Sequence, residues 1–355
     1  MTLPSMGVEE ELLLISASGM PMPQSKAVAA DAVDIDVDID VELELTRAQV
    51  EINTPVCTTS AELLGHLQRL RSTLAAAAAE EGGRLCAIAA PPTGAAEQLV
   101  TNKPRYREMA ARYGLLAREQ AVCGCHVHID VPDKEAAIRV SNHLRPWMPT
   151  LLALTANSAV YLRADTGFSS WRSIMWRRWP CSGPPPYFES AEHYDALVAM
   201  LLESDSIMDE RMVYWDIRPS THLPTVEIRV SDVPLTIEET TLLATLIRAL
   251  VMTALADGGL GPKLEPEVLR AAYWLAARDG LEADGFDVLH ARPIPMTQAV
   301  DSLVDHVGPA LESLGETERV DETVRRIISE GNGAAKQRRA FREGADIIAL
   351  TEVKP

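Results

Sequence analysis

Two cysteines and two histidines lie close together in the stretch CGCHVHIDV, residues 123–131. Thiolate and imidazole groups at such short spacing suggest a zinc site or a redox pair. The stretch also alternates in polarity, which predicts a β-strand whose successive side chains point to opposite faces. The cysteines then share a face with Val127 and Ile129, whereas His126 and His128 lie on the other face. We therefore expect no shared zinc ion, and we expect the cysteines to be core residues.

The same alternation separates apolar from ionisable side chains in four further segments, GVEEELLL, LELTRAQVEINT, YWDIRPS and TVEIRVSD. Their predicted polar faces carry carboxylates two residues apart, close enough to share a cation, together with arginines. These ionisable residues are Glu9, Glu11, Glu51, Asp216, Arg218, Glu227 and Arg229. Carboxylates with one imidazole and no cysteine favour Mg²⁺ or Mn²⁺ over structural zinc. The alternative is that these are ordinary solvent-exposed faces of half-buried antiparallel strands.

Magnesium sites with arginines nearby commonly serve phosphoryl transfer. The sequence contains no G-x-x-x-x-G-K-[ST] loop and no G-x-G-x-x-G after a predicted strand. The segment EGNGAAKQRR has glycines and basic residues but neither spacing. Any nucleotide would therefore be held by another architecture, with metal ions carrying its phosphates.

Charge and composition narrow the class of protein. The 355 residues carry a formal net charge of −18, which argues against nucleic acid or an anionic membrane as partner. The segment MTLPSMGVEEELLLIS lacks the basic region of a signal peptide, and the apolar stretch TTLLATLIRALVMTALA contains Arg248, which indicates a core helix. Five cysteines without a framework spacing suit a reducing compartment, so we expect a cytoplasmic protein.

The order of predicted elements indicates an α+β fold, because strands mixed with helices come first and helices follow. We expect one catalytic domain over residues 1–355, strand-rich over 1–235 and helical over 236–355. The acidic run DAVDIDVDIDVELEL is expected to be an extended edge strand or hairpin, and the chain after Glu265 is expected to be helical. Residues 134–159 are expected to form a long helix that Pro146 could break.

Six motifs occur in an order that matches one known family: GVEEELLL, ELTRAQVEINTPVC, CGCHVHIDVP, TGFSSWRSIMWRRWPCSGPPPYF, YWDIRPSTHLPTVEIRVSDVP and GNGAAKQRR. Over residues 6–342 the sequence resembles the carboxylate–amine ligases of the glutamate–cysteine ligase type 2 family. The resemblance implies a glutamine-synthetase-like fold. In that fold a curved, mostly antiparallel sheet forms an open half-barrel, its polar face is the active site, and helices pack behind it.

The resemblance also implies an ATP-dependent, ADP-forming ligase. In such enzymes ATP phosphorylates a carboxylate, and an amine then displaces phosphate from the acyl phosphate to form an amide. The implied substrates are a small-molecule carboxylate, with glutamate giving a γ-glutamyl bond, and an amine such as cysteine. The implied cofactors are ATP and two or three Mg²⁺ ions, which Mn²⁺ could replace, and a homo-oligomer is expected.

Individual roles follow from the resemblance as well. The implied metal ligands are Glu9, Glu11, Glu44, Glu51, His126 and Glu227. Arg229 and Arg172 are the implied catalytic arginines, which hold the transferred phosphoryl group or the acid substrate. The residues implied to bind substrate are Arg172, His128 and Trp171, and those implied to bind ATP are Arg218 and Arg338.

Two segments depart from the family pattern, the acidic run and the Trp- and Arg-rich segment around Trp171. The second segment either packs as a loop or forms a pocket for a larger or anionic substrate. Two other functions stay open: a phosphotransferase built on the same sheet, which would form no amide, and a non-catalytic member that binds a nucleotide or metabolite. Every expected metal position is filled by a suitable residue, which favours the ligase.

Overall fold

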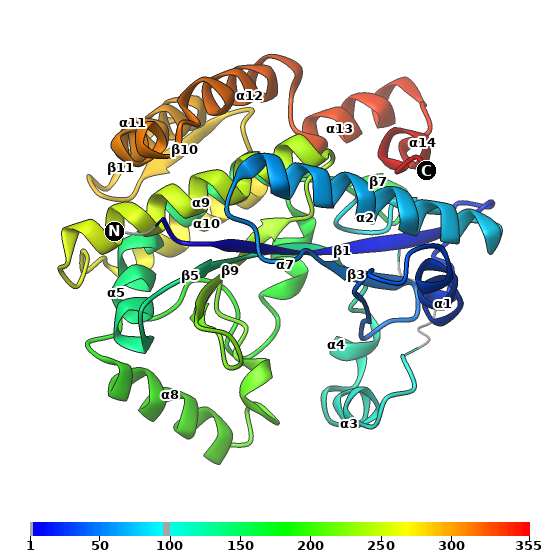
Figure 1. Cartoon of the computed structure of the whole chain (residues 1–355), viewed down its shortest axis with the longest axis horizontal. Coiled ribbons are helices and arrows are strands. Elements are labelled where there is room, and N and C mark those ends of the chain that lie inside the picture. Colours follow the sequence, from blue (N-terminus) through cyan, green and yellow to red (C-terminus); the bar gives the residue numbers. More distant parts are fainter. Residues whose placement is uncertain (1–2, 95–99) are drawn as a thin grey trace.

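The structure is a computed structural model that describes residues 3–94 and 100–355 (Figure 1). The strands are β1 (Met6–Ser16), β2 (Val41–Leu43), β3 (Gln49–Asn53), β4 (Gly83–Cys86), β5 (Gly124–Asp130), β6 (Val160–Tyr161), β7 (Ala164–Asp165), β8 (Ile217–Pro219), β9 (Thr225–Asp232), β10 (Asp284–Asp287) and β11 (Arg292–Pro295). The α-helices are α1 (Ser25–Ile35), α2 (Ser60–Glu80), α3 (Pro104–Tyr113), α4 (Leu115–Arg118), α5 (Lys134–Leu144), α6 (Met148–Thr155), α7 (Trp171–Trp176), α8 (Ala191–Glu203), α9 (Ile237–Asp257), α10 (Pro266–Asp279), α11 (Met296–Leu314), α12 (Thr317–Glu330), α13 (Gly333–Glu343) and α14 (Ile347–Thr351). Two 3₁₀ turns, η1 (Arg145–Trp147) and η2 (Glu210–Met212), complete the elements.

Seven strands form one open sheet in the order β2–β3–β1–β5–β9–β8, with β4 also paired to β1. Every pairing in this sheet is antiparallel. One edge of β1 pairs with β3, and the other edge pairs first with β5 and then with β4. The α+β class and the mostly antiparallel open sheet expected from the sequence are confirmed.

Helices cover the apolar face of the sheet. In Figure 1, α2 and α9–α12 lie above the sheet, whereas α3, α4 and α8 lie below it. Val8, Cys125 and Val127 are fully buried in the largest hydrophobic cluster, where β1 and β5 pack against α9. All five cysteines are buried and unpaired. The alternation in β5 therefore places its cysteines in the core and leaves its histidines on the opposite, polar face.

The helix α9 is the central helix of this core. Its N-cap Thr236 accepts a hydrogen bond from the Glu239 amide at 3.3 Å, and the Glu239 carboxylate accepts one from the Leu235 amide at 3.2 Å. Thr236 therefore caps the first turn of α9, while the Glu239 carboxylate binds the amide one residue before the N-cap and not the N-cap amide of a capping box. By length and composition α9 could cross a membrane, but 78% of its apolar window is buried inside the protein. The structure therefore places α9 as the core helix that the sequence predicted.

The acidic run is not extended throughout, so this prediction is corrected. Its first part belongs to α1, and only Val41–Leu43 forms a strand. Val28 and Ala32 lie four residues apart on one helical face and are fully buried beside α2. This burial at helical spacing outweighs the period of two in the acidic residues, which begins only near the end of α1.

The helical regions contain one further difference and one confirmation. The chain after Glu265 is not wholly helical, because β10 and β11 form a hairpin. Pro293 and Pro295 lie in β11, where they oppose helix formation, and Ile294 packs into the core. The predicted break at Pro146 is confirmed, since α5 ends at Leu144 and the 3₁₀ turn η1 follows.

Candidate active site

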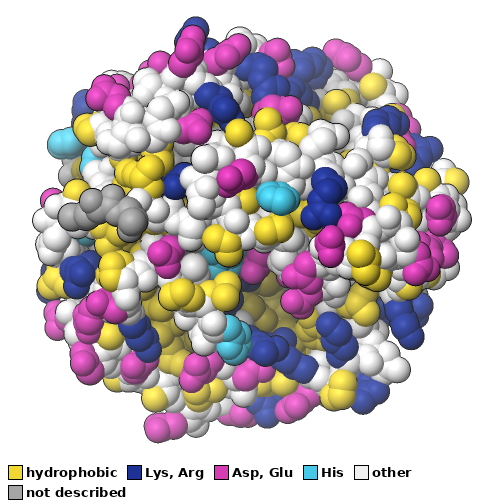
Figure 2. Space-filling view, viewed as in Figure 1, with side chains coloured by type: hydrophobic (Ala, Val, Ile, Leu, Met, Phe, Trp, Pro, Cys, Tyr) yellow, Lys and Arg dark blue, Asp and Glu magenta, His cyan; other side chains and the backbone are white. Residues whose placement is uncertain are grey.

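A cavity of about 300 Å³ opens on the polar face of the sheet. Its floor comes from β1, β3, β5 and β9, and its walls come from α3, the end of α7 and residues 211–223. Figure 2 shows a hollow in this face of the molecule, edged by acidic, basic and histidine side chains. The lining includes all six predicted metal ligands: Glu9, Glu11, Glu44, Glu51, His126 and Glu227.

Strand pairing brings these residues together from distant parts of the sequence. The cross-strand neighbours are Glu9 with His126, Glu11 with Glu51, and His128 with Glu227. Side chains directly opposite each other on one face of an antiparallel pair lie close enough to interact. The register of four strands therefore assembles the acidic floor.

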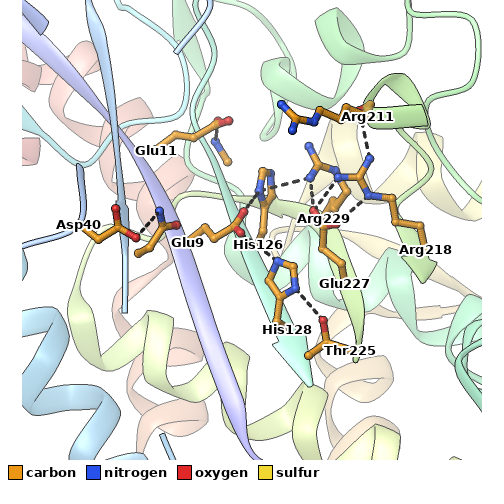
Figure 3. Close-up of polar contacts among 12 residues, drawn as sticks. Glu9, Glu11, Asp40, His126, His128, Arg211, Arg218, Thr225, Glu227 and Arg229 are labelled. Atoms are coloured by element: carbon orange, nitrogen blue, oxygen red, sulfur yellow. Dashed lines mark hydrogen bonds and ion pairs between the residues drawn. The ribbon is translucent and has the colours of Figure 1, made fainter. Parts of the chain in front are cut away.

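One group of side chains, here called the histidine cluster, consists of Glu9, His126 and Glu227 (Figure 3). Their candidate ligand atoms lie within 4.8 Å of one another. Glu9 Oε2 lies 3.0 Å from His126 Nδ1, and Glu9 Oε1 lies 3.0 Å from His128 Nε2. Burial favours protonation of Glu9, but hydrogen bonds from His126 and His128 outweigh it and hold the Glu9 pKa well below its usual range.

Two arginines neutralise Glu227 within this cluster. Arg218 Nε donates to Glu227 Oε2 at 2.7 Å, and Arg229 Nη1 donates to Glu227 Oε1. Burial alone would raise the Glu227 pKa, but Arg218 and then Arg229 hold it well below its usual range. Arg229 Nη1 also lies 3.4 Å from His126 Nδ1. The carboxylates of the histidine cluster are thus balanced by cations of the protein itself.

The second group, here called the carboxylate cluster, consists of Glu11, Glu44 and Glu51, with ligand atoms again within 4.8 Å of one another. In the described parts of the chain, no ion pair involves these three side chains. Burial and repulsion by Glu11 raise the pKa of Glu44 to about 7. Burial, followed by repulsion from Glu44 and Glu9, raises the pKa of Glu51 well above its usual range. Without a proton or an added cation, this cluster holds its negative charge unfavourably.

The donor set fits divalent cations. Five carboxylates and one imidazole form an oxygen-rich set, which Mg²⁺ and Mn²⁺ prefer. The raised pKa values of Glu44 and Glu51 are an independent sign, because a bound cation would offset the repulsion that causes them. Each of the two clusters has the side chains and spacing to hold one cation.

Of the other predicted residues, His128, Arg218 and Arg229 line the cavity, whereas Arg172 does not. Arg172 is buried beside Gly124, where an added Cβ would lie 2.3 Å from the guanidinium. Its Nη2 donates to the backbone carbonyl of Arg229 at 3.4 Å, and its Nη1 lies 3.9 Å from Asp232 Oδ1. In this structure Arg172 therefore supports β5 and β9 from outside the cavity.

Trp171 and Arg338 also lie outside the cavity lining. The Trp171 ring packs near Phe168, with ring centroids 5.6 Å apart. Arg338 belongs to α13 and pairs with Glu282 at 2.6 Å. The structure thus does not bring these two residues together with the histidine and carboxylate clusters, and their roles in binding stay predictions.

Sequence reasoning did not single out the aromatic wall of the cavity. Trp176, Trp179 and Tyr214 line it, and the centroids of Trp176 and Tyr214 lie 4.8 Å apart. Burial raises the pKa of Tyr214 to about 12, so its hydroxyl stays protonated near neutral pH. The density of Trp in WRSIMWRRW was the available signal, but it did not indicate which tryptophan faces the cavity.

Sequence reasoning also did not identify two arginines that line the cavity. Arg105 lines it and makes a paired contact with Asp209, from Nε at 2.7 Å and Nη2 at 2.9 Å. Arg211 also lines it and forms no ion pair among the described residues. Both lie in segments whose residues do not alternate in polarity, so assigning residues to strand faces could not identify them. Among the described residues, Arg211 is thus the lining arginine without an ion-pair partner.

Three comparisons place the chain among known proteins. The sequence profile described as glutamate-cysteine ligase family 2 (GCS2) matches residues 5–352. A relative from Nocardia farcinica named "Putative glutamate--cysteine ligase 2-1" is 51% identical over 99% of this chain and 92% of its own length. A relative from Mycolicibacterium vanbaalenii named "Putative glutamate--cysteine ligase 2-2" is 51% identical over 97% of this chain and 95% of its own length.

A solved structure agrees on the fold. The glutamate–cysteine ligase of Francisella tularensis in complex with AMP superposes with a TM-score of 0.71, over 99% of this chain and 88% of that chain. At 14% identity this likeness concerns the fold alone, and it confirms the expected glutamine-synthetase-like architecture. The profile match spans nearly the whole chain, and the relatives share about half of its residues. The chain therefore belongs to glutamate–cysteine ligase family 2.

Proposed function

We propose that this ligase is ATP-dependent and ADP-forming, and that it joins a small-molecule carboxylate to an amine through an acyl phosphate. The acid is proposed to be glutamate, activated at its side-chain carboxylate, so that the product carries a γ-glutamyl bond. The observation that carries the proposal is the pair of three-residue clusters in one cavity, next to Arg229 and Arg218. Membership of the glutamate–cysteine ligase family supports the choice of reaction class.

In the proposed first step, an oxygen of the substrate carboxylate attacks the γ-phosphorus of ATP, and ADP leaves. In the second step, the amine nitrogen attacks the acyl carbon, phosphate leaves, and the amine gives up a proton. The two clusters would hold Mg²⁺, which would supply positive charge against the phosphates of ATP. Such transfer depends mainly on positioning and electrostatic stabilisation, which preorganised charges supply.

The protein's own side chains have distinct parts in this proposal. Arg229 is held in place by Glu227 and by the backbone carbonyl of Asp216, which accepts from the Arg229 amide at 2.8 Å. Its charge therefore needs little reorganisation when negative charge develops on the transferred phosphoryl group. Arg211 supplies further positive charge at the rim. Trp176 and Tyr214 make an apolar wall that would limit access of water to the acyl phosphate.

A hydroxamate assay tests the proposal directly. The purified protein is incubated with ATP, Mg²⁺, one amino acid at a time and hydroxylamine as a small amine. Glutamate alone should give a hydroxamate together with ADP, because hydroxylamine traps an acyl phosphate. The Glu51→Gln variant is the matched negative control. ATP binding without hydroxamate from any acid would refute the ligase proposal, and phosphate transfer to an acceptor without amide would favour a phosphotransferase.

The cellular location, oligomeric state and cofactors of the enzyme are also proposed. A cytoplasmic location is supported by five buried cysteines that form no disulfide. A homo-oligomer is proposed from the family resemblance, and light scattering on the purified chain measures it. ATP and Mg²⁺ are the proposed cofactors, and cysteine is the first amine to screen once the acid is known.

A further inference from the structure

A second large cavity, here called the arginine cavity, lies apart from the candidate active site. It has a volume of about 560 Å³ and lies between the turn η1, the loop at residues 182–187 and α10. Within residues 3–94 and 100–355, no residue lines both cavities. The loop is the last part of the Trp-, Arg- and Pro-rich segment, and the proposed function uses no residue of this loop. The arginine cavity is therefore a separate feature that needs its own explanation.

The charge of this cavity is unusual for so acidic a protein. Arg145, Arg177 and Arg270 line it, and no carboxylate does so among the described residues. Arg145 is only 3% exposed, and in the described chain it has no ion pair. Its Nε donates to the carbonyl of Pro185 at 3.0 Å, but its Nη1 is buried without a hydrogen-bond partner. A buried cation without a counter-ion is costly, so the structure leaves room for an anion here.

Arg177 presents a second donor of the same kind. Its Nη2 is buried without a hydrogen-bond partner, and its guanidinium lies 5.1 Å from the centre of the Tyr273 ring. Burial lowers the pKa of both Arg145 and Arg177. Asp216 offsets this effect for Arg177, whereas only tyrosines offset it for Arg145. Guanidinium groups with free N–H donors are the protein groups best suited to carboxylate and phosphate oxygens.

The rest of the lining is mainly apolar. Residues 184–186 are three consecutive prolines, and Tyr187 and Leu269 extend the same surface. Prolines and rings form rigid walls that bury apolar area at little cost in conformational entropy. An inorganic ion would leave most of this space and surface unused. The lining therefore suits a ligand with an anionic group at one end and an apolar body at the other.

We propose that the arginine cavity is a binding site for a small organic anion, whose carboxylate or phosphate group contacts Arg145 and Arg177 and whose apolar body lies against the prolines and Tyr187. The site is independent of the reaction proposed above. Arg270, which also lines the cavity, is largely exposed and already pairs with Glu267, 3.2 Å from its Nη1, so the proposal rests on Arg145 and Arg177.

The test is an equilibrium titration of the metal-free and nucleotide-free protein by calorimetry, with phenyl phosphate, benzoate and inorganic phosphate as separate probes. At least one organic anion should bind, and inorganic phosphate should bind at least about fivefold more weakly because it buries no apolar area. The stronger organic probe identifies the preferred anionic group. Equal affinity for inorganic phosphate would refute the proposed apolar contact.

Variants locate the site. Arg145→Gln and Arg177→Gln should each weaken binding of the organic anion about tenfold, since each removes charged hydrogen bonds. Arg218→Gln in the active-site cavity and the exposed Arg342→Gln change the charge equally and should leave the affinity unchanged. If Arg145→Gln does not fold, the loss of affinity in Arg177→Gln tests the proposal by itself. Absence of binding by either organic anion, or loss of binding in Arg218→Gln but not in Arg177→Gln, would overturn the proposal.

Discussion

The two clusters of the active-site cavity have similar side chains but opposite electrostatics. Arg218 and Arg229 pair with Glu227 of the histidine cluster, and both carboxylates of this cluster have lowered pKa values. The carboxylate cluster has no ion-pair partner in the described chain, and two of its carboxylates have raised pKa values. Both clusters lie within one cavity, so a general difference in burial between regions of the protein does not explain the contrast.

The contrast originates in the strands. On β9, Glu227 and Arg229 are two residues apart and therefore point to the same face. On β1, Glu9 and Glu11 share a face without a basic neighbour on the same strand, and β3 adds Glu51 opposite Glu11. The histidine cluster can thus assemble during folding without a metal ion. The carboxylate cluster becomes favourable only when a proton or a metal ion joins it.

The largest expected effect is on catalysis, from Glu51→Gln in the carboxylate cluster. The variant keeps the size of the side chain but removes a charge that would hold a divalent cation. Hydroxamate formation at saturating ATP should fall about 10²–10³-fold, the size expected when one group that holds transition-state charge is lost. The exposed Glu343→Gln should retain full activity. Activity of Glu51→Gln within about threefold of the parent would show that the carboxylate cluster does not bind an essential cation.

The same substitution should have opposite effects on stability in the two clusters. Glu227→Gln leaves Arg218 and Arg229 buried without their carboxylate, so the free energy of unfolding should fall by about 3 kcal/mol without metal. Glu51→Gln removes repulsion and should leave the metal-free protein as stable as the parent or more so. Urea unfolding in the presence of a chelator measures both. Equal destabilisation by the two variants would contradict the assignment of different electrostatics to the clusters.

The pH dependence of stability should separate the clusters as well. The folded pKa of Glu44 is about 7, above its value of 4.5 in the unfolded chain, so the folded protein binds more protons between these values. Its stabilising contribution is present below about pH 4.5 and is lost as pH rises to 7, at a cost of about 2 kcal/mol after allowance for solvent screening. Glu9 and Glu227 have lowered pKa values, so their contributions are lost only as pH falls below 4.5.

Thermal unfolding of the protein with a chelator present, measured across this pH range, tests whether stability changes with pH in the predicted direction. Glu44→Gln should flatten the slope between about pH 5 and pH 7, whereas Glu343→Gln should not. Added Mg²⁺ should raise the melting temperature more at about pH 8 than at about pH 5.5, because protons compete with the metal for the carboxylates. A larger effect of Mg²⁺ at the lower pH would place the cation elsewhere.

Much of the site was predictable because a strand sorts its residues by a period of two. That rule placed Glu9, Glu11, Glu51, His126, Glu227 and Arg229 on polar faces and the cysteines in the core, and the family motifs added Glu44. The rule carries no information about which arginine pairs with which carboxylate, since that depends on register between strands. The division into a balanced and an unbalanced cluster therefore appears only in three dimensions.

Other features could not be predicted from the sequence, because they depend on contacts between residues far apart in the chain. The helix α1 is stabilised by burial of Val28 and Ala32 beside α2, and nothing in the acidic run itself indicates that contact. In the segment WRSIMWRRW, the turn of α7 directs Trp171 away from the cavity and Trp176 towards it. Arg172 lies outside the cavity lining as well, with its guanidinium beside Gly124 of β5. Sequence spacing alone cannot distinguish these directions in a short helix.

The smallest expected effect concerns the arginines outside the clusters. Arg211 lines the cavity without an ion pair in the described chain, so its charge is available to the phosphates of ATP. Arg211→Gln should raise the KM for ATP about threefold to tenfold with little change in kcat, as expected for a contact made equally in the ground and transition states. Arg338→Gln should change the KM less than about twofold, because Glu282 already pairs with this guanidinium outside the cavity.

Initial rates at varied ATP with saturating glutamate and hydroxylamine measure both variants against the parent. An effect of Arg338→Gln equal to that of Arg211→Gln would mean that α13 reaches the nucleotide in the working enzyme, as the family motif GNGAAKQRR implies. An unchanged KM in Arg211→Gln would instead assign the phosphates to Arg218 and Arg229 alone. The two arginines that pair with Glu227 would then supply all of the cationic side chains used on ATP, and the carboxylate cluster would contribute only through its metal ion.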